Sequence, residues 1–297
     1  MSGKIGLVLS GGGAKGAYEI GVYKALSDMG ALPYIDAIAG TSVGALNAAL
    51  LESQGAEYAE EIWSNLKITD LLNPDTNRIS KAILPYNNLP SLTFSNPLDR
   101  AVSNGVNLFR TFTRGNGLME FIREGLPFNQ EKIADLIDDH VIFNRIHRNL
   151  YVVCTDAITN PKIFALNDYF PQTQKKIILA SSTLPVVYTG TDGVEINGIN
   201  YFDGGVAGDV SNTPVGCLYD NGYRNIIVVH LKREYNISNQ DYMKDANIIN
   251  IFPSRSLGNF LTGTLNLNPV KVQADMELGY RDTAKYRDEI AYMIYTL

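Results

Sequence analysis

The sequence predicts an α/β protein, a three-layer α/β/α sandwich with a mainly parallel central sheet. Short, continuously apolar segments alternate with helical segments, beginning with a strand at 5–9 and a helix at 14–29. Strands that are apolar at every position are typical of parallel sheets, because both of their faces are covered. A glycine-rich turn follows each of the first two strands, and a helix follows each turn. This alternation is the βαβα pattern of a sheet covered by helices.

The other elements follow in order along the chain. A second strand is predicted at 35–39 and a long helix at 45–66, apolar in its first half. A short helix is predicted at 175–181, and turns with a final helix near 283–295 are predicted for the tail. Further strands are predicted at 141–143, 150–154 and 225–230.

The segment 75–117 departs from this pattern. It contains Pro85, Pro90 and Pro97, many Asn and Ser residues, and little hydrophobic periodicity. Such a segment is typical of an irregular surface loop, and long loops of this kind often carry function. We therefore expect one domain over 1–297 with an insertion at 75–117 that borders the substrate entrance.

The bulk composition excludes several classes of protein. With 297 residues, 45% hydrophobic residues and a formal net charge of -6, the chain reads as globular and acidic, which disfavours nucleic acid as a partner. Cys154 and Cys217 belong to no C-x-x-C pair, so both are expected to be buried and reduced. We find no signal-peptide pattern and no apolar run of membrane-spanning length. The expected location is cytoplasmic, with transient contact at a membrane surface; no pattern specifies an oligomeric state.

The first chemical motif is a G-x-S-x-G turn between a strand and a helix, Gly40-Thr41-Ser42-Val43-Gly44. Glycines on both sides allow a tight turn that presents the serine hydroxyl above the sheet. The positive end of the following helix favours the negative charge that develops during attack on an ester. Ser42 is the predicted nucleophile, although a simple helix-capping serine would show the same pattern.

The second motif also joins a strand to a helix, Gly11-Gly12-Gly13-Ala14-Lys15-Gly16. Backbone N–H groups without neighbouring Cβ atoms are suited to hold the oxyanion of acyl transfer, and this role is predicted for Gly11, Gly12 and Gly13. A phosphate cradle is the alternative, because G-x-G-x-x-G also matches. The loop is not a Walker A motif, since Gly16 follows Lys15 where Ser or Thr is required.

The third motif is the turn Asp203-Gly204-Gly205. By itself it reads as an ordinary turn. A serine elbow, however, needs a base within hydrogen-bond reach, and a carboxylate can serve if burial raises its pKa. Asp203 is therefore the predicted base.

Together these motifs resemble the patatin-like phospholipases, in which a glycine-rich oxyanion loop, a serine elbow and an Asp-Gly-Gly turn follow one another in this order. The block Ala180-Ser181-Ser182-Thr183-Leu184-Pro185 is similar to the family's A-S-x-x-x-P, and Asn212 and Pro214 are similar to a following N-x-P. A late element, Gly279-Tyr280-Arg281-Asp282, is also similar to one in bacterial members. Lys15 stands where many members carry Arg. The resemblance implies a patatin-like sandwich and a Ser42–Asp203 dyad that hydrolyses fatty acyl esters of lipids through an acyl-enzyme, without a metal or cofactor.

Two other functions fit parts of the sequence. An α/β-hydrolase-type esterase would use a triad in the order Ser42, Asp203, His230, although a structural histidine at the end of a strand is the simpler reading of His230. A lipid- or nucleotide-binding protein without catalysis could use the same scaffold. His140 and His147 are expected on the surface, and no cluster of His and Cys indicates a metal site.

Overall fold

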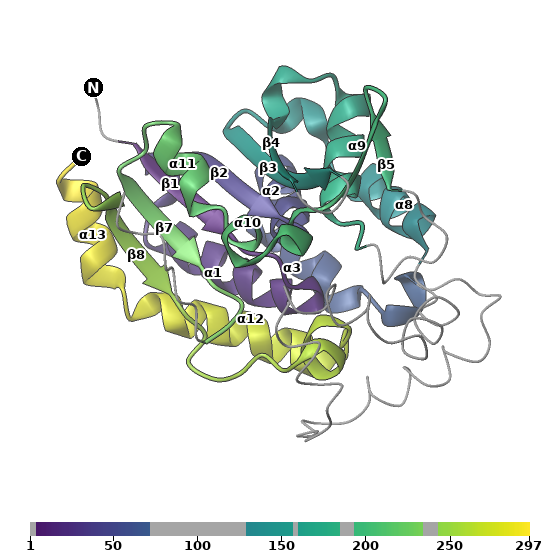
Figure 1. The fold of residues 1–297 in the computed structure, drawn as a ribbon. Helices are drawn as coiled ribbons and strands as arrows, with labels where there is room; N and C mark the ends of the chain where they lie inside the picture. Colours follow the sequence, from purple (N-terminus) through teal and green to yellow (C-terminus); the bar gives the residue numbers. More distant parts are fainter. Residues whose placement is uncertain (1–3, 72–128, 157–159, 185–192, 234–242) are drawn as a thin grey trace.

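The computed structural model describes residues 4–71, 129–156, 160–184, 193–233 and 243–297. Within these ranges eight strands form one sheet in the order β5-β6-β3-β2-β1-β7-β8, with β4 paired to β3 (Figure 1). The strands are β1 (Ile5–Leu9), β2 (Ile35–Thr41), β3 (Asn149–Asp156), β4 (Asn160–Ala165), β5 (Val194–Ile196), β6 (Ile199–Asp203), β7 (Asn225–Val229) and β8 (Asn247–Ile251). The α-helices are α1 (Ala17–Asp28), α2 (Val43–Gln54), α3 (Ala56–Asn65), α8 (Gln130–His140), α9 (Pro171–Ser181), α10 (Asp209–Asn212), α11 (Val215–Asp220), α12 (Pro269–Ala284) and α13 (Arg287–Tyr295).

The sheet is mainly parallel, as predicted. Strands β3, β2, β1, β7 and β8 pair in parallel, and their buried residues are almost continuously apolar. Strands β4, β5 and β6 are antiparallel additions beside β3. This antiparallel pairing sets Asp203, the last residue of β6, opposite Cys154 on β3.

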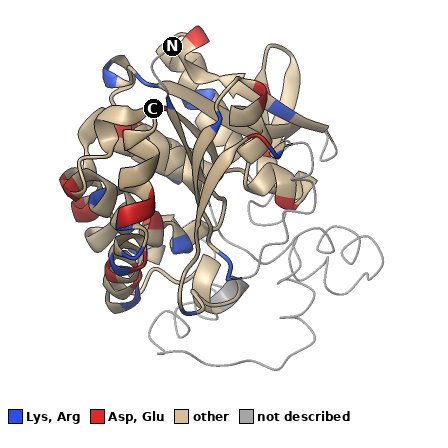
Figure 2. Ribbon diagram, turned by 90° about the vertical axis from the view of Figure 1, so that its left-hand side faces the viewer, with Lys and Arg blue, Asp and Glu red and all other residues tan. Residues whose placement is uncertain are grey.

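Helices cover both faces of the sheet, which confirms the three-layer prediction (Figure 1). The larger hydrophobic core lies under α1, α2, α3, α9 and α12 and includes Leu7, Leu9 and Ile38 from the strands. The smaller core lies under α11 and includes Val8 and Ala39. Charged residues are spread over the outer helices and loops, while the central strands are almost free of them (Figure 2). No helix within the described ranges is long and apolar enough to cross a membrane.

Three of the predicted elements were wrong in their limits or type. The helix expected at 45–66 is two helices, because Gly55 adopts a φ of 87° that ends α2 and starts α3 in a new direction. The strand expected at 141–143 is absent, and Phe143–Arg145 forms a 3₁₀ turn instead. The tail contains a second helix, α12, whose start is marked by the side chain of Asn268 accepting from two backbone N–H groups, with Pro269 next.

Two further predictions concern the cysteines and the segment 75–117. Cys154 and Cys217 are buried and free of disulfides, as expected. The predicted insertion at 75–117 lies outside the described residues.

The parallel register places the two glycine motifs side by side. Leu9 at the end of β1 pairs with Gly40 near the end of β2. Ser10 follows β1 directly and precedes the glycine loop, and Ser42 follows β2 directly. Because adjacent parallel strands end at the same edge, both motifs lie at the carboxyl edge of the sheet, where open α/β sheets bind their ligands.

Candidate active site

Ser42 occupies a strained turn between β2 and α2. Its backbone has a φ of 57° and a ψ of -127°, and Asn197 is the other described non-glycine residue with positive φ. A Cβ atom at Gly40 would lie 2.6 Å from the carbonyl of Gly44, and one at Gly44 would overlap the carbonyl oxygen of Leu9. Only glycine fits these two positions, so the flanking glycines are required by the close approach of β1, β2 and α2.

Hydrogen bonds hold the strained serine in place. The backbone N–H of Ser42 donates to Oγ of Ser181 over 2.9 Å, and that hydroxyl donates to the carbonyl of Val153 over 2.7 Å. The carbonyl of Ser42 accepts from the N–H groups of Ala45 and Leu46, the first turn of α2. Ser181 thus braces the elbow from α9, a role that the sequence alone did not assign to it.

Asp203 is buried at the end of β6, with 1% of its surface exposed. Burial raises its pKa to about 7, against the opposing effects of a side-chain hydrogen bond with Ser42 and a backbone hydrogen bond from Gly205. The Gly205 N–H donates to Oδ1 over 2.7 Å. Within the described residues, no group of regular hydrogen-bond geometry reaches Oδ2.

The two glycines after Asp203 are set by close contacts. A Cβ atom at Gly204 would lie 2.5 Å from the carbonyl oxygen of Val153, and one at Gly205 would lie 2.5 Å from Oδ1 of Asn212. Asn212 also joins the glycine loop: its Nδ2 donates to the carbonyl of Gly11, and the Gly11 N–H donates back to the Asn212 carbonyl over 2.9 Å. The Asp203 turn and the glycine loop are therefore fixed against each other through Asn212.

The three glycines of the loop differ in what their N–H groups do. That of Gly11 is already engaged by Asn212, whereas those of Gly12 and Gly13 donate to no residue in the described ranges. Gly13 has a φ of 59°, and a Cβ atom there would lie 2.5 Å from the carbonyl oxygen of Thr264. At the end of the loop, a Cβ atom on Gly16 would lie 2.5 Å from the Val43 side chain, so this glycine lets the loop pack on α2.

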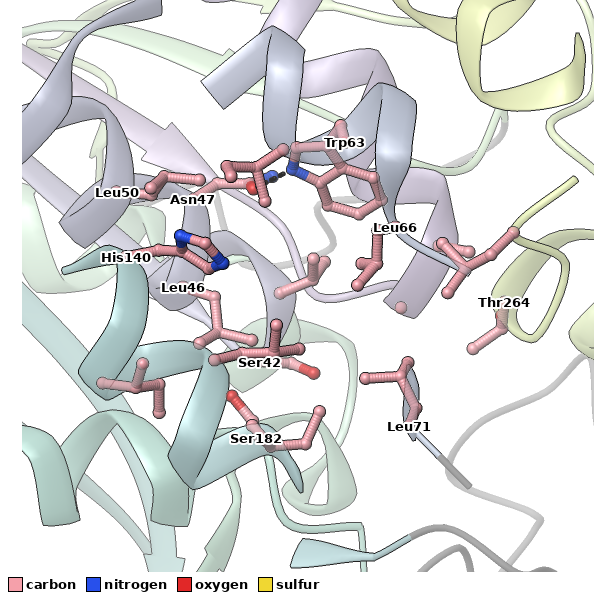
Figure 3. Close-up of a pocket in the computed structure, with 18 of the residues that line it drawn as sticks. Ser42, Leu46, Asn47, Leu50, Trp63, Leu66, Leu71, His140, Ser182 and Thr264 are labelled. Carbon is pink, nitrogen blue, oxygen red and sulfur yellow. Dashed lines mark hydrogen bonds between the residues drawn. The ribbon is translucent and has the colours of Figure 1, made fainter. Parts of the chain in front are cut away.

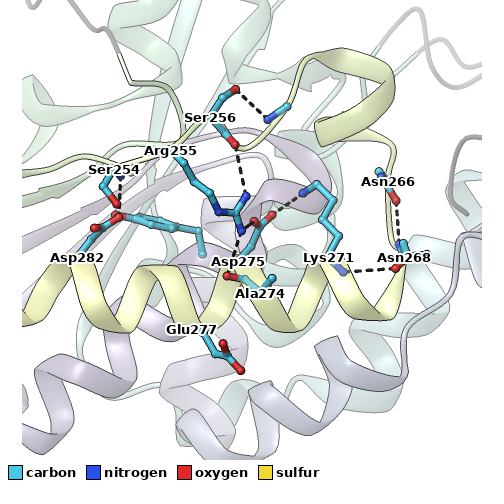
Figure 4. A network of polar contacts seen from close by, with 12 residues as sticks. Ser254, Arg255, Ser256, Asn266, Asn268, Lys271, Ala274, Asp275, Glu277 and Asp282 are labelled. Carbon is cyan, nitrogen blue, oxygen red and sulfur yellow. Dashed lines mark hydrogen bonds and ion pairs between the residues drawn. The ribbon is translucent and has the colours of Figure 1, made fainter. Parts of the chain in front are cut away.

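Lys15 is partly buried beside the loop. Burial, together with the nearby positive charges of Lys232 and Lys271, lowers the pKa of Lys15 to about 8, while the negative charge of Asp275 opposes them. Figure 4 shows Asp275 on α12 held between Arg255 and Lys271. Asp275 is thus paired with two cations and is also the nearby negative charge that acts on Lys15.

An apolar cavity of about 170 Å³ opens beside Ser42 (Figure 3). Most of its wall consists of aliphatic side chains from α2, α3 and α8, with the ring of Trp63. Its polar lining residues are Ser42, Asn47, His140, Ser182 and Thr264. The expectation that His140 is a surface residue was wrong: it is partly buried, lines this cavity, and shares a 3.0 Å hydrogen bond between Nδ1 and the Tyr58 hydroxyl. His147 is exposed, as expected.

His230 is bound to the neighbouring strand. Its Nε2 lies 2.9 Å from Oδ1 of Asn250 on β8, and its ring stacks on Phe252 with 4.1 Å between the ring centres. Burial lowers the pKa of His230 to about 4. No group of three or more His, Cys, Asp or Glu residues that could hold a metal ion occurs in the described part of the chain.

The chain has relatives among proteins of known name. It is 59% identical over 46 residues to lysophospholipase nte1 of Aspergillus terreus and 38% identical over 86 residues to patatin-like phospholipase domain-containing protein 7 of Rattus norvegicus. These matches cover 16% and 26% of this chain but only 3% and 6% of the relatives. The chain thus spans a small part of the length of these much longer proteins.

The fold has a counterpart among solved structures. VipD from Legionella pneumophila superposes with a TM-score of 0.53 at 14% sequence identity, over 97% of this chain and 67% of VipD. The likeness concerns the fold alone. In the sequence, a model of the family described as Patatin-like phospholipase matches residues 7–217, which include the glycine loop, the serine elbow and the Asp203 turn. The chain therefore belongs to the patatin-like phospholipase family.

Proposed function

We propose that this chain is a single lipid acyl hydrolase domain of the phospholipase A or lysophospholipase type. Its nucleophile is Ser42 and its base is Asp203. One observation carries the proposal: a strained serine lies beside a buried carboxyl group of raised pKa, at the mouth of an apolar cavity. A strained backbone, a buried carboxyl group and an apolar cavity each occur in many proteins. Their combination around one serine is typical of a nucleophilic site.

In the first half of the reaction, Oγ of Ser42 attacks the carbonyl carbon of the ester while its proton moves to Asp203. A carboxylate with a pKa of about 7 is a far better base than an ordinary one, and half of it is still ionised at neutral pH. The carbonyl oxygen becomes an oxyanion. Because the N–H of Gly11 is engaged, the oxyanion hole narrows to Gly12 and Gly13. Asp203 then returns the proton to the leaving alcohol, and the acyl group stays on Ser42.

In the second half, a water molecule attacks the acyl-enzyme. Asp203 takes a proton from the water, and the same two N–H groups hold the second oxyanion. The bond between Ser42 and the acyl carbon breaks, Asp203 gives the proton back to Oγ, and a fatty acid leaves.

The cavity supports a fatty acyl group as the part of the substrate that is recognised. It begins at Ser42 and continues along α2 past Leu46 to Leu50, a distance of about 12 Å at the rise of an α-helix. An apolar acyl chain gains free energy by leaving water for such a wall. The named relatives are a lysophospholipase and a patatin-like phospholipase, which agrees with a lipid ester as substrate. Transient contact with a membrane surface stays a prediction.

The triad with His230 is the weaker alternative. Its Nε2 and its ring face are taken up by Asn250 and Phe252, and a pKa of about 4 makes the imidazole a poor base at neutral pH. The pKa of Asp203 is set by burial and by hydrogen bonds with Ser42 and Gly205, and no imidazole contributes to it. These contacts favour the dyad.

A fluorophosphonate probe tests the proposal directly. It should label the wild-type protein at Ser42, and hydrolysis of p-nitrophenyl esters should stop when the label is complete. Ser42→Ala should remove both label and activity. Ser53→Ala is the matched control, because Ser53 is a buried serine within α2, and its hydroxyl donates to the carbonyl of Leu50 in the same helix. A wild-type protein that takes no label would be a binder rather than a hydrolase.

A further inference from the structure

A second buried carboxyl group lies beneath the glycine loop. Glu19 on α1 is completely buried, and its Oε2 accepts from Nδ2 of Asn47 on α2 over 2.8 Å. The backbone N–H of Ser10 is its other polar neighbour and acts against the effect of burial on its pKa. No hydrogen bond of regular geometry reaches Oε1 from the part of the chain that the structure describes. A carboxyl group buried with so few partners is costly, and the proposed chemistry does not use it.

Asn47 has all its polar atoms engaged. Besides Glu19, its Nδ2 donates to the carbonyl of Gly16 over 3.0 Å, and its Oδ1 accepts from Nε1 of Trp63 over 2.9 Å (Figure 3). An indole N–H can only donate, so Trp63 requires the amide oxygen of Asn47 to face it. Both amide hydrogens must then point to Gly16 and Glu19. Trp63 therefore fixes the orientation in which Asn47 holds the loop.

The two side chains reach both ends of the glycine loop. Glu19 lies at Ser10, the residue directly before Gly11, and Asn47 lies at Gly16, the last glycine. Between these ends are the two N–H groups that donate to no described residue, those of Gly12 and Gly13. We propose that Glu19 and Asn47 are positioning residues that hold the glycine loop at its two ends and connect it, through Trp63, to the wall of the acyl cavity. This inference rests on the proposed function for its effect on rate.

The connection to the cavity follows from where the residues point. Asn47 and Trp63 both line the cavity, as do Ser42 and Gly13. An acyl chain that fills the cavity packs against the same two side chains that orient the loop. A displaced oxyanion donor lowers the rate even when the substrate still binds, because the donor acts only on the transition state. Loss of the network should therefore lower kcat more than it changes KM.

Burial favours the neutral form of Glu19. Burial is the largest effect on its pKa and raises it well above the ordinary value, and the hydrogen bonds from Asn47 and Ser10 only partly oppose this. A neutral carboxyl group still accepts from Asn47. An isosteric amide should do the same, whereas an aliphatic side chain leaves a buried amide hydrogen of Asn47 without an acceptor.

The experiment compares Glu19→Leu, Glu19→Gln and Asn47→Leu with Ser53→Ala as the matched control. Fluorophosphonate titration counts the reactive Ser42 sites, and kcat for p-nitrophenyl butyrate is expressed per labelled serine. Glu19→Leu and Asn47→Leu should lower this kcat by about 10²-fold, the scale of a misplaced catalytic group, with little change in KM. Glu19→Gln should restore it to within roughly 3-fold, the scale of one altered neutral hydrogen bond.

A merely structural network gives a different result. It would lower the melting temperature and the labelled fraction while leaving kcat per labelled serine unchanged in both Leu variants, and this outcome would overturn the proposal. If neither Leu variant folds, Trp63→Phe keeps an aromatic ring but loses the indole N–H together with part of the ring, and it should still lower kcat by roughly 3- to 10-fold.

Amide hydrogen exchange over 10–16 gives an answer that does not depend on activity. Exchange should be faster in Glu19→Leu and Asn47→Leu than in the wild type and in Ser53→Ala. Unchanged exchange would contradict the positioning role, whether or not the protein hydrolyses esters. Absence of labelling in the wild type would instead remove only the proposed function.

Discussion

Asp203 and Glu19 are both buried carboxyl groups beside a glycine motif, and burial raises the pKa of both. Their neighbours differ. Asp203 forms a side-chain hydrogen bond with Ser42, and no other side chain within the described ranges bonds to its Oδ2, whereas Glu19 accepts from the amide of Asn47 and lies under the loop. The comparison shows that a raised pKa alone does not identify a catalytic base. We propose as the base the carboxyl group that lies beside Ser42, and we propose that the other one holds the structure around it.

The largest expected difference between the two carboxyl groups concerns their amide variants. Asp203→Asn cannot accept a proton from Ser42, so kcat/KM for p-nitrophenyl butyrate should fall by about 10⁴-fold or more, the scale of losing a member of a catalytic unit. Glu19→Gln keeps its acceptor and should stay near the wild-type value. Comparable losses in the two variants would show that the roles have been assigned wrongly.

The next largest expected effect concerns the proposed oxyanion donors, the backbone N–H groups of Gly12 and Gly13. Gly13→Ala places a Cβ atom 2.5 Å from the carbonyl oxygen of Thr264 and puts alanine at a φ of 59°. It should lower kcat by roughly 10²- to 10³-fold, the usual scale for losing an oxyanion donor. Gly12→Ala meets only the side chain of Leu231, which can move, so its loss should be smaller. Full kcat in both variants would return phosphate binding to consideration.

A third test concerns the wall of the acyl cavity. Leu50 lies two turns of α2 beyond Ser42, so Leu50→Phe should shorten the space for an acyl chain. The ratio of p-nitrophenyl palmitate to butyrate hydrolysis should fall by about 10-fold or more, within the range for changes in an apolar pocket. An unchanged ratio in the variant would place the acyl chain elsewhere.

The pH dependence of activity, measured in both the wild type and His230→Ala, distinguishes Asp203 from an imidazole base. Asp203 must be ionised to accept a proton, so kcat/KM should rise with pH through about 7, the raised pKa of this carboxyl group. A histidine would give a limb in the same range. We therefore expect His230→Ala to keep most of the activity and the same limb. A collapse of activity in this variant, with its fold preserved, would make Asp203 the third member of a triad.

The smallest expected effect is on stability. The folded-state pKa of Asp203 lies above its unfolded value, so the stability that the protonated carboxyl group gives is complete below about pH 4 and is lost as the pH rises through about 7. The direction is the same for Glu19. The amide variants Asp203→Asn and Glu19→Gln cannot ionise, so they should lose less stability than the wild type as the pH rises. The difference in melting temperature, variant minus wild type, should therefore be larger at about pH 9 than at about pH 5. Parallel curves for the wild type and both variants would show that the carboxyl groups are not buried as described.

Local signals account for most of the predicted site. The glycines around Ser42 and after Asp203 were found because each permits a close backbone approach, and only glycine allows it. The sequence could not predict which loop N–H groups have partners, since no pattern indicates that the Gly11 N–H donates to the Asn212 carbonyl, 201 positions along the chain. Glu19 and Asn47 were not identified, because their partners lie on different helices. The N-x-P similarity was the one signal that pointed to Asn212.

By itself, the sequence determined the alternation of strands and helices, the turns that carry Ser42 and Asp203, and the family to which the chain belongs. These features depend on hydrophobic periodicity and on glycine, which act over a few residues. The tertiary structure decided the rest: it buried Asp203 deeply enough to raise its pKa, tied Gly11 to Asn212, and set Glu19 beneath the loop. Burial and hydrogen bonding between distant segments depend on how the layers pack, and packing brings together residues that no local pattern relates.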